Sequence, residues 1–425
     1  MNVRITPRPL TGRVRAIASK SAAHRALICA ALARRCAAAG ENGTGAFTAL
    51  CARFERDETG FEPSEDILAT IGCLKALLGA QAGAAPCLDC GESGSTLRFL
   101  LPVAAAVAGE AFFTGRGRLP ERPLGALRTV MEAHGCRFSA PSLPFTVSGR
   151  LSGGRYALPG NVSSQYITGL LLALPLAAAD SRIALTCPLE SAAYVEMTLA
   201  ALARFGVRVD KTEDGFAIAG GQRYGEPETL AVEGDWSNAA FFLTAGMLGG
   251  DVTVTGLDGG SAQADRAILA LLAAFGADTA PAAGEARAAR GRESIRPQRI
   301  DVSAFPDLFP ILAVAACGGM GDTVLENAAR LRLKESDRIT STAQMISALG
   351  GSVSERADAL IVHGCGRLLG GTVESCCDHR IAMAAAAASV LCAEPVVVRG
   401  AEAVRKSYPR FFEDFQQLGG IADVV

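Results

Sequence analysis

The stretch Val195–Ile218, VEMTLAALARFGVRVDKTEDGFAI, shows the pattern that decides the fold of this chain. Its first half carries apolar residues at helical spacing, namely Val195, Leu199 and Leu202. Gly206 follows them and suits a left-handed cap at the end of a helix. The second half alternates in polarity on both sides of Asp214-Gly215, which is typical of a β-hairpin. The stretch therefore predicts a helix, a glycine stop and a hairpin.

The same pattern occurs six times, each time with a glycine directly after an apolar helical run. The six glycines are Gly79, Gly135, Gly206, Gly276, Gly350 and Gly419. They are separated by 56, 71, 70, 74 and 69 residues, so a repeated unit of about 70 residues accounts for the chain. Another hairpin is expected around Asp358. Six α+β units divide most simply into two domains of three, with the boundary near residues 225–235.

Length, composition and charge narrow the possible functions. With 425 residues, 49% of them hydrophobic, the chain is long enough for two cores. A net charge of −2 gives no overall attraction to nucleic acid or to an anionic membrane, so neither is an expected partner. The apolar stretches Gly169–Ala179 and Ile381–Ala393 are shorter than the roughly 18–20 residues that span a bilayer. Residues 1–10 lack the apolar run of a signal peptide, which predicts a cytoplasmic location.

The cysteines do not predict a disulfide framework or a metal site. There are thirteen, an odd number scattered through alanine-rich stretches, which favours reduced thiols in the core. Cys87 and Cys90 form one C-x-x-C motif without a second pair at zinc-finger spacing, and Cys376-Cys377 is an equally weak metal signal. Residues 37–64 mix glycine, charged residues and cysteine without periodicity, so we expect a surface excursion there and assign it no role.

Polar groups that suit an anion precede several apolar helical runs in the first half. In Ser19–Arg25, SKSAAHR, we expect Ser19 or Ser21 to cap the next helix, and Lys20 with Arg25 favours a phosphate or carboxylate. Similar segments are Cys90–Arg98 before a helix over 99–108, Glu121-Arg122-Pro123 at the start of the second repeat helix, and Asn161–Tyr166 before a helix over 167–177. A capped, solvated helix start explains each one alone. Their recurrence predicts one ligand site assembled from several repeats.

The second half adds four more polar segments: Phe305–Asp307, Leu333–Arg338, Asp378–Arg380 and Arg405–Pro409. A solvent-exposed face explains each when taken singly. Lys334, Glu335 and Arg338 span one helical turn, so an ordinary ion pair is one explanation of that segment. His379 equally suits a core position.

Taken together, these motifs resemble the enolpyruvyl transferases, and within them the 5-enolpyruvylshikimate-3-phosphate synthase family. The resemblance runs from Ser19 to Pro409. Its pieces, in the family's order, are Ser19-Lys-Ser, Gly94 with Arg98, Glu121-Arg-Pro, Ser163-Ser-Gln165, Ser191 with Tyr194, Pro306-Asp307, Lys334-Glu-Ser-Asp-Arg338, Asp378-His-Arg380 and Lys406. The ordered series is far more specific than any single member.

The resemblance implies an α+β fold of two domains, an inverse α/β prism in which each domain consists of three βαβαββ units. Residues 19–228 would form one domain, residues 1–18 and 229–425 the other, with the active site in the cleft between them. The implied reaction transfers the enolpyruvyl group of phosphoenolpyruvate to the 5-hydroxyl of shikimate 3-phosphate and releases phosphate, in the route to aromatic amino acids. It implies no metal or other cofactor, these two small-molecule partners, and a monomer.

The resemblance also implies residue roles, and both substrates demand cations because each carries phosphate and carboxylate groups. The implied catalytic residues are Asp307 as the base, with Glu335 and Lys20 in proton transfer at the methylene carbon and the intermediate. Phosphoenolpyruvate would contact Lys20, Gly94, Arg122, Gln165, Arg338, Arg380 and Lys406. Shikimate 3-phosphate would contact Lys20, Ser21, Arg25, Ser163, Ser164, Gln165, Ser191, Tyr194, Asp307 and Lys334.

Two alternative functions remain open, and three residues differ from the commonest family pattern. The sister enzyme that modifies UDP-N-acetylglucosamine normally has an early Lys-Asn pair, whereas this chain has Lys20-Ser21. A catalytically inactive relative would have lost site lysines or carboxylates, which are present here. Glu92, Ser95 and Arg330 depart from the commonest family pattern. Gly94 rather than alanine implies sensitivity to glyphosate.

Overall fold

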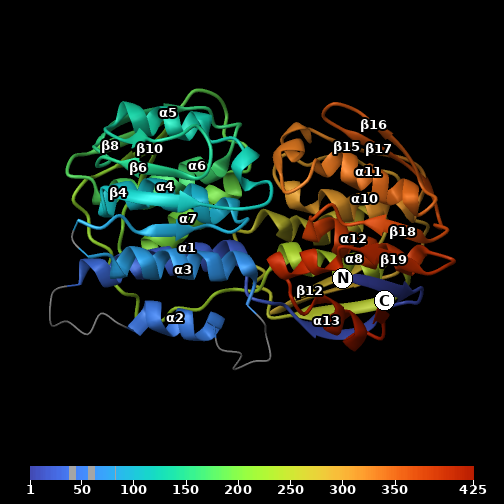
Figure 1. The fold of residues 1–425 in the computed structure, drawn as a ribbon. Helices are drawn as coiled ribbons and strands as arrows, with labels where there is room; N and C mark the ends of the chain where they lie inside the picture. Colours follow the sequence, from blue (N-terminus) through green and yellow to red (C-terminus); the bar gives the residue numbers. More distant parts are fainter. Residues whose placement is uncertain (38–44, 56–62, 82) are drawn as a thin grey trace. The chain divides into compact units, whose positions relative to one another are not determined.

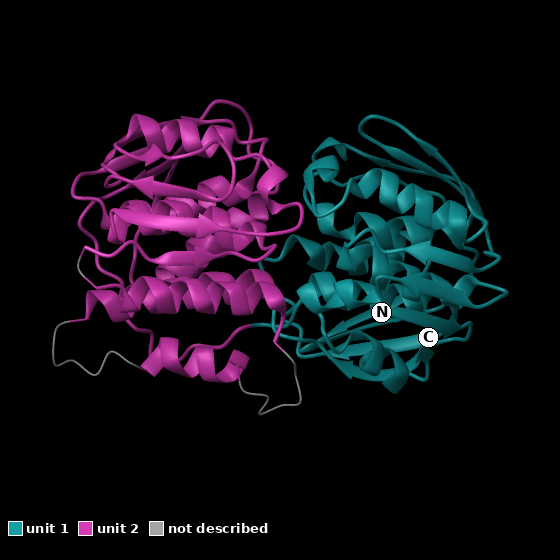
Figure 2. Cartoon of the chain, viewed as in Figure 1, with its two compact units in different colours: residues 1–19, 233–425 teal, residues 20–232 magenta. Residues whose placement is uncertain are grey.

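The chain divides into two compact units in a computed structural model that describes residues 1–37, 45–55, 63–81 and 83–425. Unit 1 consists of residues 1–19 and 233–425, and unit 2 consists of residues 20–232 (Figure 2). The divisions therefore fall after Ser19 and after Val232, compared with the expected divisions after residues 18 and 228.

One strand topology recurs in both units. The described residues form five four-stranded sheets, and in each the first two strands are parallel and the other neighbours are antiparallel. Unit 2 contains β3 (Cys87–Asp89), β4 (Glu110–Thr114), β6 (Phe145–Ser148) and β5 (Arg137–Phe138) in one sheet, and β7 (Gly154–Leu158), β8 (Ser181–Leu185), β10 (Gly215–Ile218) and β9 (Asp210–Thr212) in the other. The spatial order is first, second, fourth, third. It is the order of a βαβαββ unit.

Unit 1 contains three sheets with this arrangement, although in the third sheet the place of the fourth strand is taken by β1, the first strand of the chain. They are β2 (Thr11–Arg15), β11 (Asp251–Thr255), β13 (Glu285–Ala289) and β12 (Asp278–Ala282); β14 (Arg299–Asp301), β15 (Met320–Glu326), β17 (Leu360–Cys365) and β16 (Ser352–Glu355); and β18 (Gly371–Glu374), β19 (Val396–Arg399), β1 (Asn2–Thr6) and β20 (Ile421–Val424). The N-terminal strand β1 thus lies between β19 and β20, which brings the two chain ends together (Figure 1). Strand β2 pairs in parallel with β11, more than two hundred residues later in the chain.

Because parallel neighbours need a crossover connection, a helix lies between the first and second strand of each unit. These crossover helices are α4 (Gly94–Val107) and α6 (Ser164–Ala173) in unit 2, and α8 (Trp236–Gly249), α10 (Phe309–Cys317) and α12 (His379–Ala388) in unit 1. A second set follows the second strands: α5 (Gly125–Ala133), α7 (Ala192–Arg204), α9 (Ile268–Phe275), α11 (Arg338–Ala348) and α13 (Phe411–Gln417).

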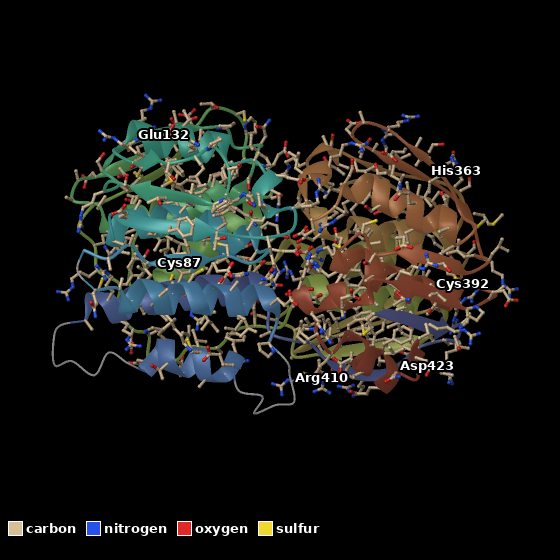
Figure 3. The ribbon with its side chains drawn as sticks, in the orientation of Figure 1. Cys87, Glu132, His363, Cys392, Arg410 and Asp423 are labelled. Atoms are coloured by element: carbon tan, nitrogen blue, oxygen red, sulfur yellow. The ribbon has the colours of Figure 1, made fainter. Side chains whose placement is uncertain are left out.

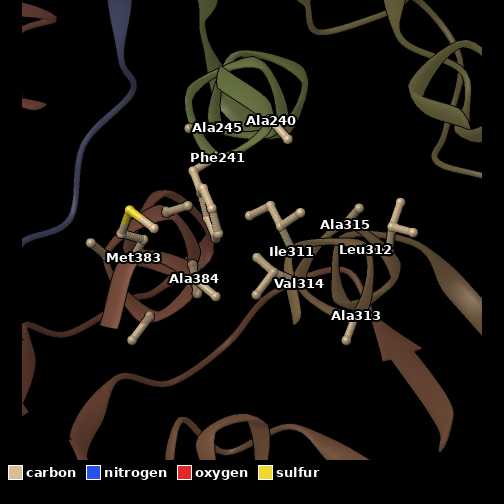
Figure 4. Close-up of a cluster of buried hydrophobic side chains, with 14 of the residues drawn as sticks. Ala240, Phe241, Ala245, Ile311, Leu312, Ala313, Val314, Ala315, Met383 and Ala384 are labelled. Carbon is tan, nitrogen blue, oxygen red and sulfur yellow. The ribbon is translucent and has the colours of Figure 1, made fainter. Parts of the chain in front are cut away.

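Small apolar side chains let the crossover helices of unit 1 pack closely around one core. Figure 4 shows Phe241 of α8 beside Met383 and Ala384 of α12, with Ile311 and Val314 of α10 facing them. All ten residues of α12 are buried. A helix that is apolar on almost every side belongs in the interior. The polar residues at the amino end of α12, His379 and Arg380, are buried as well.

Unit 2 begins with three helices: α1 (Lys20–Cys36), α2 (Gly45–Glu55) and α3 (Glu65–Gly79). Residues 23–33 of α1 are buried without a break. The expected surface excursion at 37–64 is wrong for its described central part, because α2 buries Phe47, Leu50 and Cys51. The rest of that expectation, at 38–44 and 56–62, lies outside the described residues.

The local predictions are mostly confirmed. Strand β9 pairs with β10 across Asp214, and β16 pairs with β17 across Asp358. Five of the six glycines after helices have positive φ, between +75° and +107°. Gly79 is the exception, because it is still helical and Ala80 ends α3 in an extended conformation. The expectation of core thiols holds for most cysteines but is wrong for Cys87, Cys365, Cys376 and Cys377, which are exposed; all thirteen are free.

Candidate active site

In unit 2, the predicted site residues cluster at the amino ends of helices. Ser93 caps α4 by accepting a hydrogen bond from the Thr96 amide, and Ser163 caps α6 by accepting one from the Gln165 amide. Such ends present backbone N–H groups and a positive partial charge to an anion. Lys20 is the first residue of α1, so Ser19 precedes the helix while Ser21 lies inside its first turn and is not its cap. The expected helix start at Glu121 is also wrong, because α5 begins at Gly125 after a 3₁₀ turn over Leu119–Glu121.

Two guanidinium groups converge on Gly94. A Cβ atom placed on Gly94 would lie 2.5 Å from Nη1 of Arg98 and 2.5 Å from Nη1 of Arg122. Arg98 donates to Oε1 of Gln165 at 3.1 Å, and Nε2 of Gln165 donates to Oγ of Ser95 at 2.9 Å. Paired guanidinium groups beside a side-chain amide suit a carboxylate or phosphate. The structure thereby brings together Gly94, Arg122 and Gln165, and adds Arg98 and Ser95, which our site assignment left out.

Lys20 is held by a partner that the sequence did not reveal. Its Nζ lies 2.8 Å from Oδ2 of Asp66, in the first turn of α3, and both side chains are largely buried. Thr96 of α4 donates to the backbone carbonyl of Asp66 at 3.4 Å. The contact therefore fixes the ammonium group at the place where α1, α3 and α4 meet. The only sequence signal for Asp66 is its position two residues after Ser64, the cap of α3.

Arg25 directs its guanidinium group into the protein. Nε donates to Oγ1 of Thr198 at 2.8 Å, Nη1 to the carbonyl of Ser21 at 2.6 Å and Nη2 to the carbonyl of Tyr194 at 2.8 Å. Burial lowers the pKa of Arg25 to about 10, so it stays charged at neutral pH. These bonds tie α1 to the start of α7. Ser191, directly before α7, has a left-handed backbone with φ of +53°.

In unit 1, Asp307 lies at the centre of an ionic cluster. Its Oδ1 is 2.9 Å from Nη1 of Arg338, and its Oδ2 is 2.8 Å from Nη2 of Arg380. Nζ of Lys334 is 4.0 Å from the same Oδ1. Asp307 is positioned by the short 3₁₀ turn Pro306–Leu308 that leads into α10. One carboxylate therefore faces three cations.

Two further carboxylates complete the surroundings of Arg338, whose side chain is 1% exposed. Nη2 of Arg338 is 2.7 Å from Oε2 of Glu335, and its Nε is 3.0 Å from Oδ2 of Asp378. Asp378 also caps α12 by accepting from the Arg380 amide. Burying a charge is unfavourable unless it is paired, and here the planar guanidinium group has a partner for each of its edges.

These contacts set the protonation of the cluster. Burial by itself raises the pKa of Asp307, but the charges of Arg380, Lys334 and Arg338 outweigh it and hold the pKa well below its usual range. Burial lowers the pKa of Arg338, and Asp378, Glu335 and Asp307 more than reverse that effect. Asp307 is therefore an ionised carboxylate at neutral pH.

The explanation of Lys334, Glu335 and Arg338 as one helical turn is wrong. Asp337 caps α11 by accepting from the Thr340 amide, so the helix begins at Arg338 and the two preceding site residues lie in the loop before it. The loop still forms the Glu335–Arg338 ion pair. His379 is buried in the first turn of α12, as a core position requires.

Lys406 completes the group of predicted cations in unit 1. It ends the 3₁₀ helix Ala401–Lys406, and its Nζ donates to the Cys377 carbonyl at 2.8 Å. Cys376 and Cys377 form a turn with φ of +53° and +54° directly before α12.

Across the described ranges, no three His, Cys, Asp or Glu side chains are grouped in a way that would hold a metal ion. Across the same ranges, no helix has both the length and the apolarity needed to cross a bilayer.

The chain has the fold of the enolpyruvyl transferases. A solved enolpyruvyl transferase, NikO from Streptomyces tendae, shares the fold with a TM-score of 0.74 over 99% of this chain and 98% of that chain, at 17% identity. The EPSP synthase of Acinetobacter baumannii superposes with a TM-score of 0.75 over the full length of both chains, at 25% identity.

Sequence comparison identifies the family within this class. The family model described as EPSP synthase (3-phosphoshikimate 1-carboxyvinyltransferase) matches residues 5–415. A 3-phosphoshikimate 1-carboxyvinyltransferase of Clostridium kluyveri is 42% identical, covering 99% of this chain and 98% of the relative. The chain belongs to the EPSP synthase family.

Proposed function

We propose that this chain transfers the enolpyruvyl group of phosphoenolpyruvate to the 5-hydroxyl of shikimate 3-phosphate and releases phosphate. The observation that carries the proposal is the Asp307 cluster, in which one ionised carboxylate is held by Arg338 and Arg380 inside the region that the family model matches. The enzyme needs cations to bind two phosphorylated acids and a carboxylate to accept a proton. The cluster offers both kinds of group.

For phosphoenolpyruvate, the proposed contacts in unit 2 centre on Gly94. The guanidinium groups that converge there offer a planar fork to a phosphate or carboxylate, and the absence of a Cβ leaves room for it. Gln165 adds a neutral donor. The proposed contacts of this substrate are Lys20, Gly94, Arg122, Gln165, Arg338, Arg380 and Lys406, with Arg98 placing Gln165 through their hydrogen bond.

For shikimate 3-phosphate, the proposed contacts combine hydroxyl groups and cations. The amino end of α6 offers Ser163, Ser164 and Gln165, whose hydroxyl and amide groups suit a phosphate or a polyol. The full proposed set is Lys20, Ser21, Arg25, Ser163, Ser164, Gln165, Ser191, Tyr194, Asp307 and Lys334. Because each nitrogen of the Arg25 guanidinium group already donates to an internal acceptor, we propose that Arg25 acts mainly by holding Ser21 and Tyr194 in place.

Asp307 is the proposed base that takes the proton from the 5-hydroxyl as the oxygen attacks C2 of phosphoenolpyruvate. A carboxylate with a strongly lowered pKa is a weak base, so binding must change its surroundings. When a substrate phosphate or carboxylate binds Arg338 and Arg380, its negative charge offsets the two cations and raises the pKa of Asp307. Substrate binding therefore makes Asp307 a stronger base.

Proton transfer at C3 of phosphoenolpyruvate is assigned to Glu335 and Lys20. Glu335 lies beside Arg338 at 2.7 Å, so it is held near the same bound anion as Asp307. Lys20, with Asp66 as its counter-ion, provides an ammonium proton for the tetrahedral intermediate as phosphate leaves. Both roles require a positioned acid, which these ion pairs provide.

The test is the mass of the product. The purified protein is incubated with phosphoenolpyruvate and either shikimate 3-phosphate or UDP-N-acetylglucosamine. We expect an enolpyruvyl adduct of shikimate 3-phosphate alone. An adduct of the nucleotide sugar would show that UDP-N-acetylglucosamine is the acceptor. The absence of both adducts would indicate that the chain is a catalytically inactive relative.

A further inference from the structure

A second group of reactive side chains lies on the outer face of the sheet β14-β15-β17-β16 in unit 1. Along β17, Leu360 and Val362 point into the core, while Ile361 and His363 are partly exposed. His363 pairs with Asp322 of the neighbouring strand β15. Ser354 of the edge strand β16 lies diagonally across from His363, since it pairs with Ile361. Figure 3 labels His363 near the edge of unit 1.

These three side chains form a hydrogen-bonded series. Nδ1 of His363 is 2.7 Å from Oδ1 of Asp322, and Nε2 of His363 is 2.9 Å from Oγ of Ser354. An ionised carboxylate only accepts hydrogen bonds, so the Nδ1 atom carries the ring proton. In a neutral ring, Nε2 is then an acceptor, and the Ser354 hydroxyl donates to it. Nucleophile, base and orienting carboxylate therefore have the relation found in a Ser-His-Asp triad.

We propose that Ser354 is an acylation site that takes an acyl group from an activated, small acyl donor such as an aryl ester. Nothing in the enolpyruvyl transfer reaction uses these residues. The site is open enough for a donor to approach, because the side chain of His363 is 36% exposed and that of Asp322 is 63% exposed. The three residues come from three strands of one sheet, so the backbone ladder fixes their spacing.

The acyl transfer forms one bond and breaks another within the site. Oγ of Ser354 forms a bond to the acyl carbon as its proton passes to Nε2 of His363, and the bond from the acyl carbon to the leaving oxygen breaks. Asp322 stabilises the imidazolium ring formed in this step. The leaving group departs as a phenolate, and the proton on His363 returns to it or to water.

The geometry also limits the reaction. A positioned general base contributes about 10²–10⁴-fold to a rate. We assign no oxyanion donor beside Ser354, and loss of one such donor typically lowers kcat by about 10²–10³-fold. Only donors with a good leaving group should therefore react, and peptide bonds should not.

The experiment measures acetylation of the full-length protein by p-nitrophenyl acetate, with the modified serine located by peptide mass spectrometry. Ser142 and Ser294, which are exposed elsewhere on the chain, serve as internal reference serines. We expect Ser354 to be acetylated at least tenfold faster than either of them. His363→Gln and Asp322→Asn should each reduce that rate at least tenfold.

Three results would overturn the proposal: labelling of Ser354 no faster than that of Ser142, an unchanged rate in His363→Gln, or acetylation of the neighbouring Ser352 instead. Fluorescence of Trp236, the one tryptophan of the chain, verifies that each variant is folded. Ser354→Ala should leave phosphate release from phosphoenolpyruvate unchanged. The two activities can thus fail or succeed independently.

Discussion

Asp307 holds two buried guanidinium groups together. Because of these contacts, its pKa depends on whether an anion is bound to the two arginines. It accepts from Arg338 at 2.9 Å and from Arg380 at 2.8 Å. Removing its charge would leave these arginines paired with Glu335, Asp378 and Ser237. Arg338 therefore keeps two carboxylate partners when the charge of Asp307 is removed, and Arg380 keeps the Ser237 hydroxyl.

Asp307→Asn should reduce kcat by about 10²–10⁴-fold, because an amide cannot accept the hydroxyl proton. Affinity for phosphoenolpyruvate should be retained or increased, since both arginines become more available to the substrate anion. Steady-state kinetics and calorimetric binding measure the two effects separately. Unchanged turnover in a variant that binds both substrates would contradict the role of the base.

Gly94→Ala should raise KM for phosphoenolpyruvate at least tenfold and weaken inhibition by glyphosate. The added methyl group would lie 2.5 Å from the guanidinium nitrogens of Arg98 and Arg122, so at least one arginine must move. Gly72→Ala is the matched control, because it is also a helical glycine of unit 2 and a Cβ there meets nothing within 4 Å. Equal kinetics in the two variants would mean that the arginines do not bind this substrate.

At the residue scale, the sequence predicted which segments matter but not how their side chains pair. Lys20 and Gln165 were singled out from motifs, yet their partners Asp66 and Arg98 are 46 and 67 residues away in the sequence. No local pattern encodes such distances. The prediction of a helical turn at Lys334 was wrong because Asp337 is the capping residue, so the helix begins only at Arg338.

Helix α1 is fastened to its neighbours by buried polar contacts. Nδ1 of His24 is 2.8 Å from Oγ1 of Thr70 on α3, and Thr70 is 2.6 Å from Oγ1 of Thr96 on α4. Burial, with the nearby charges of Lys20 and Arg25, holds the pKa of His24 well below its usual range. The imidazole is therefore neutral in the folded protein at neutral pH.

Stability should fall as the pH drops below about 6.5, the pKa of histidine in an unfolded chain. There the unfolded state binds a proton at His24 and the folded state does not, so each lower pH unit removes up to about 1.4 kcal/mol until the folded pKa is reached. His24→Gln should flatten urea-unfolding stability between pH 6.5 and 5. His363→Gln, at a partly exposed histidine, is the control. An identical pH dependence for wild type and His24→Gln would contradict the prediction.

At the element scale, most of the fold was predictable because helix, glycine and hairpin each have a local signature. The hairpins at Asp214 and Asp358 follow from alternation and turn residues. Helix α2 was missed because its buried residues Phe47, Leu50 and Cys51 stand among small residues and are followed by Arg53. Its buried face appears only in the fold, where α2 packs against α1 and α3.

For the molecule as a whole, the chain's first strand closes the last sheet. Val3 and Ile5 of β1 are buried, and β1 pairs with β19 on one side and β20 on the other. No periodicity in the sequence could reveal this pairing, because the partners of β1 lie almost four hundred residues away. The family resemblance implied only that residues 1–18 belong to the same domain as residues 229–425.

Deleting residues 1–6 should destabilise unit 1 by about 3 kcal/mol or more, given the burial of two aliphatic side chains. The loss of both strand pairings of β1 adds to the effect. Trp236 is the only tryptophan and lies in unit 1, so its fluorescence during urea unfolding reports on that unit. Deletion of Met1 alone is the control. An unchanged unfolding midpoint in the longer deletion would show that β1 is not needed to hold the sheet.

The most direct test of the proposed function is phosphate release from phosphoenolpyruvate by the purified protein, followed with shikimate 3-phosphate, with UDP-N-acetylglucosamine and without an acceptor. We expect release with shikimate 3-phosphate only, and a loss of that release in Asp307→Asn. Release with the nucleotide sugar, or no release with either acceptor, would contradict it.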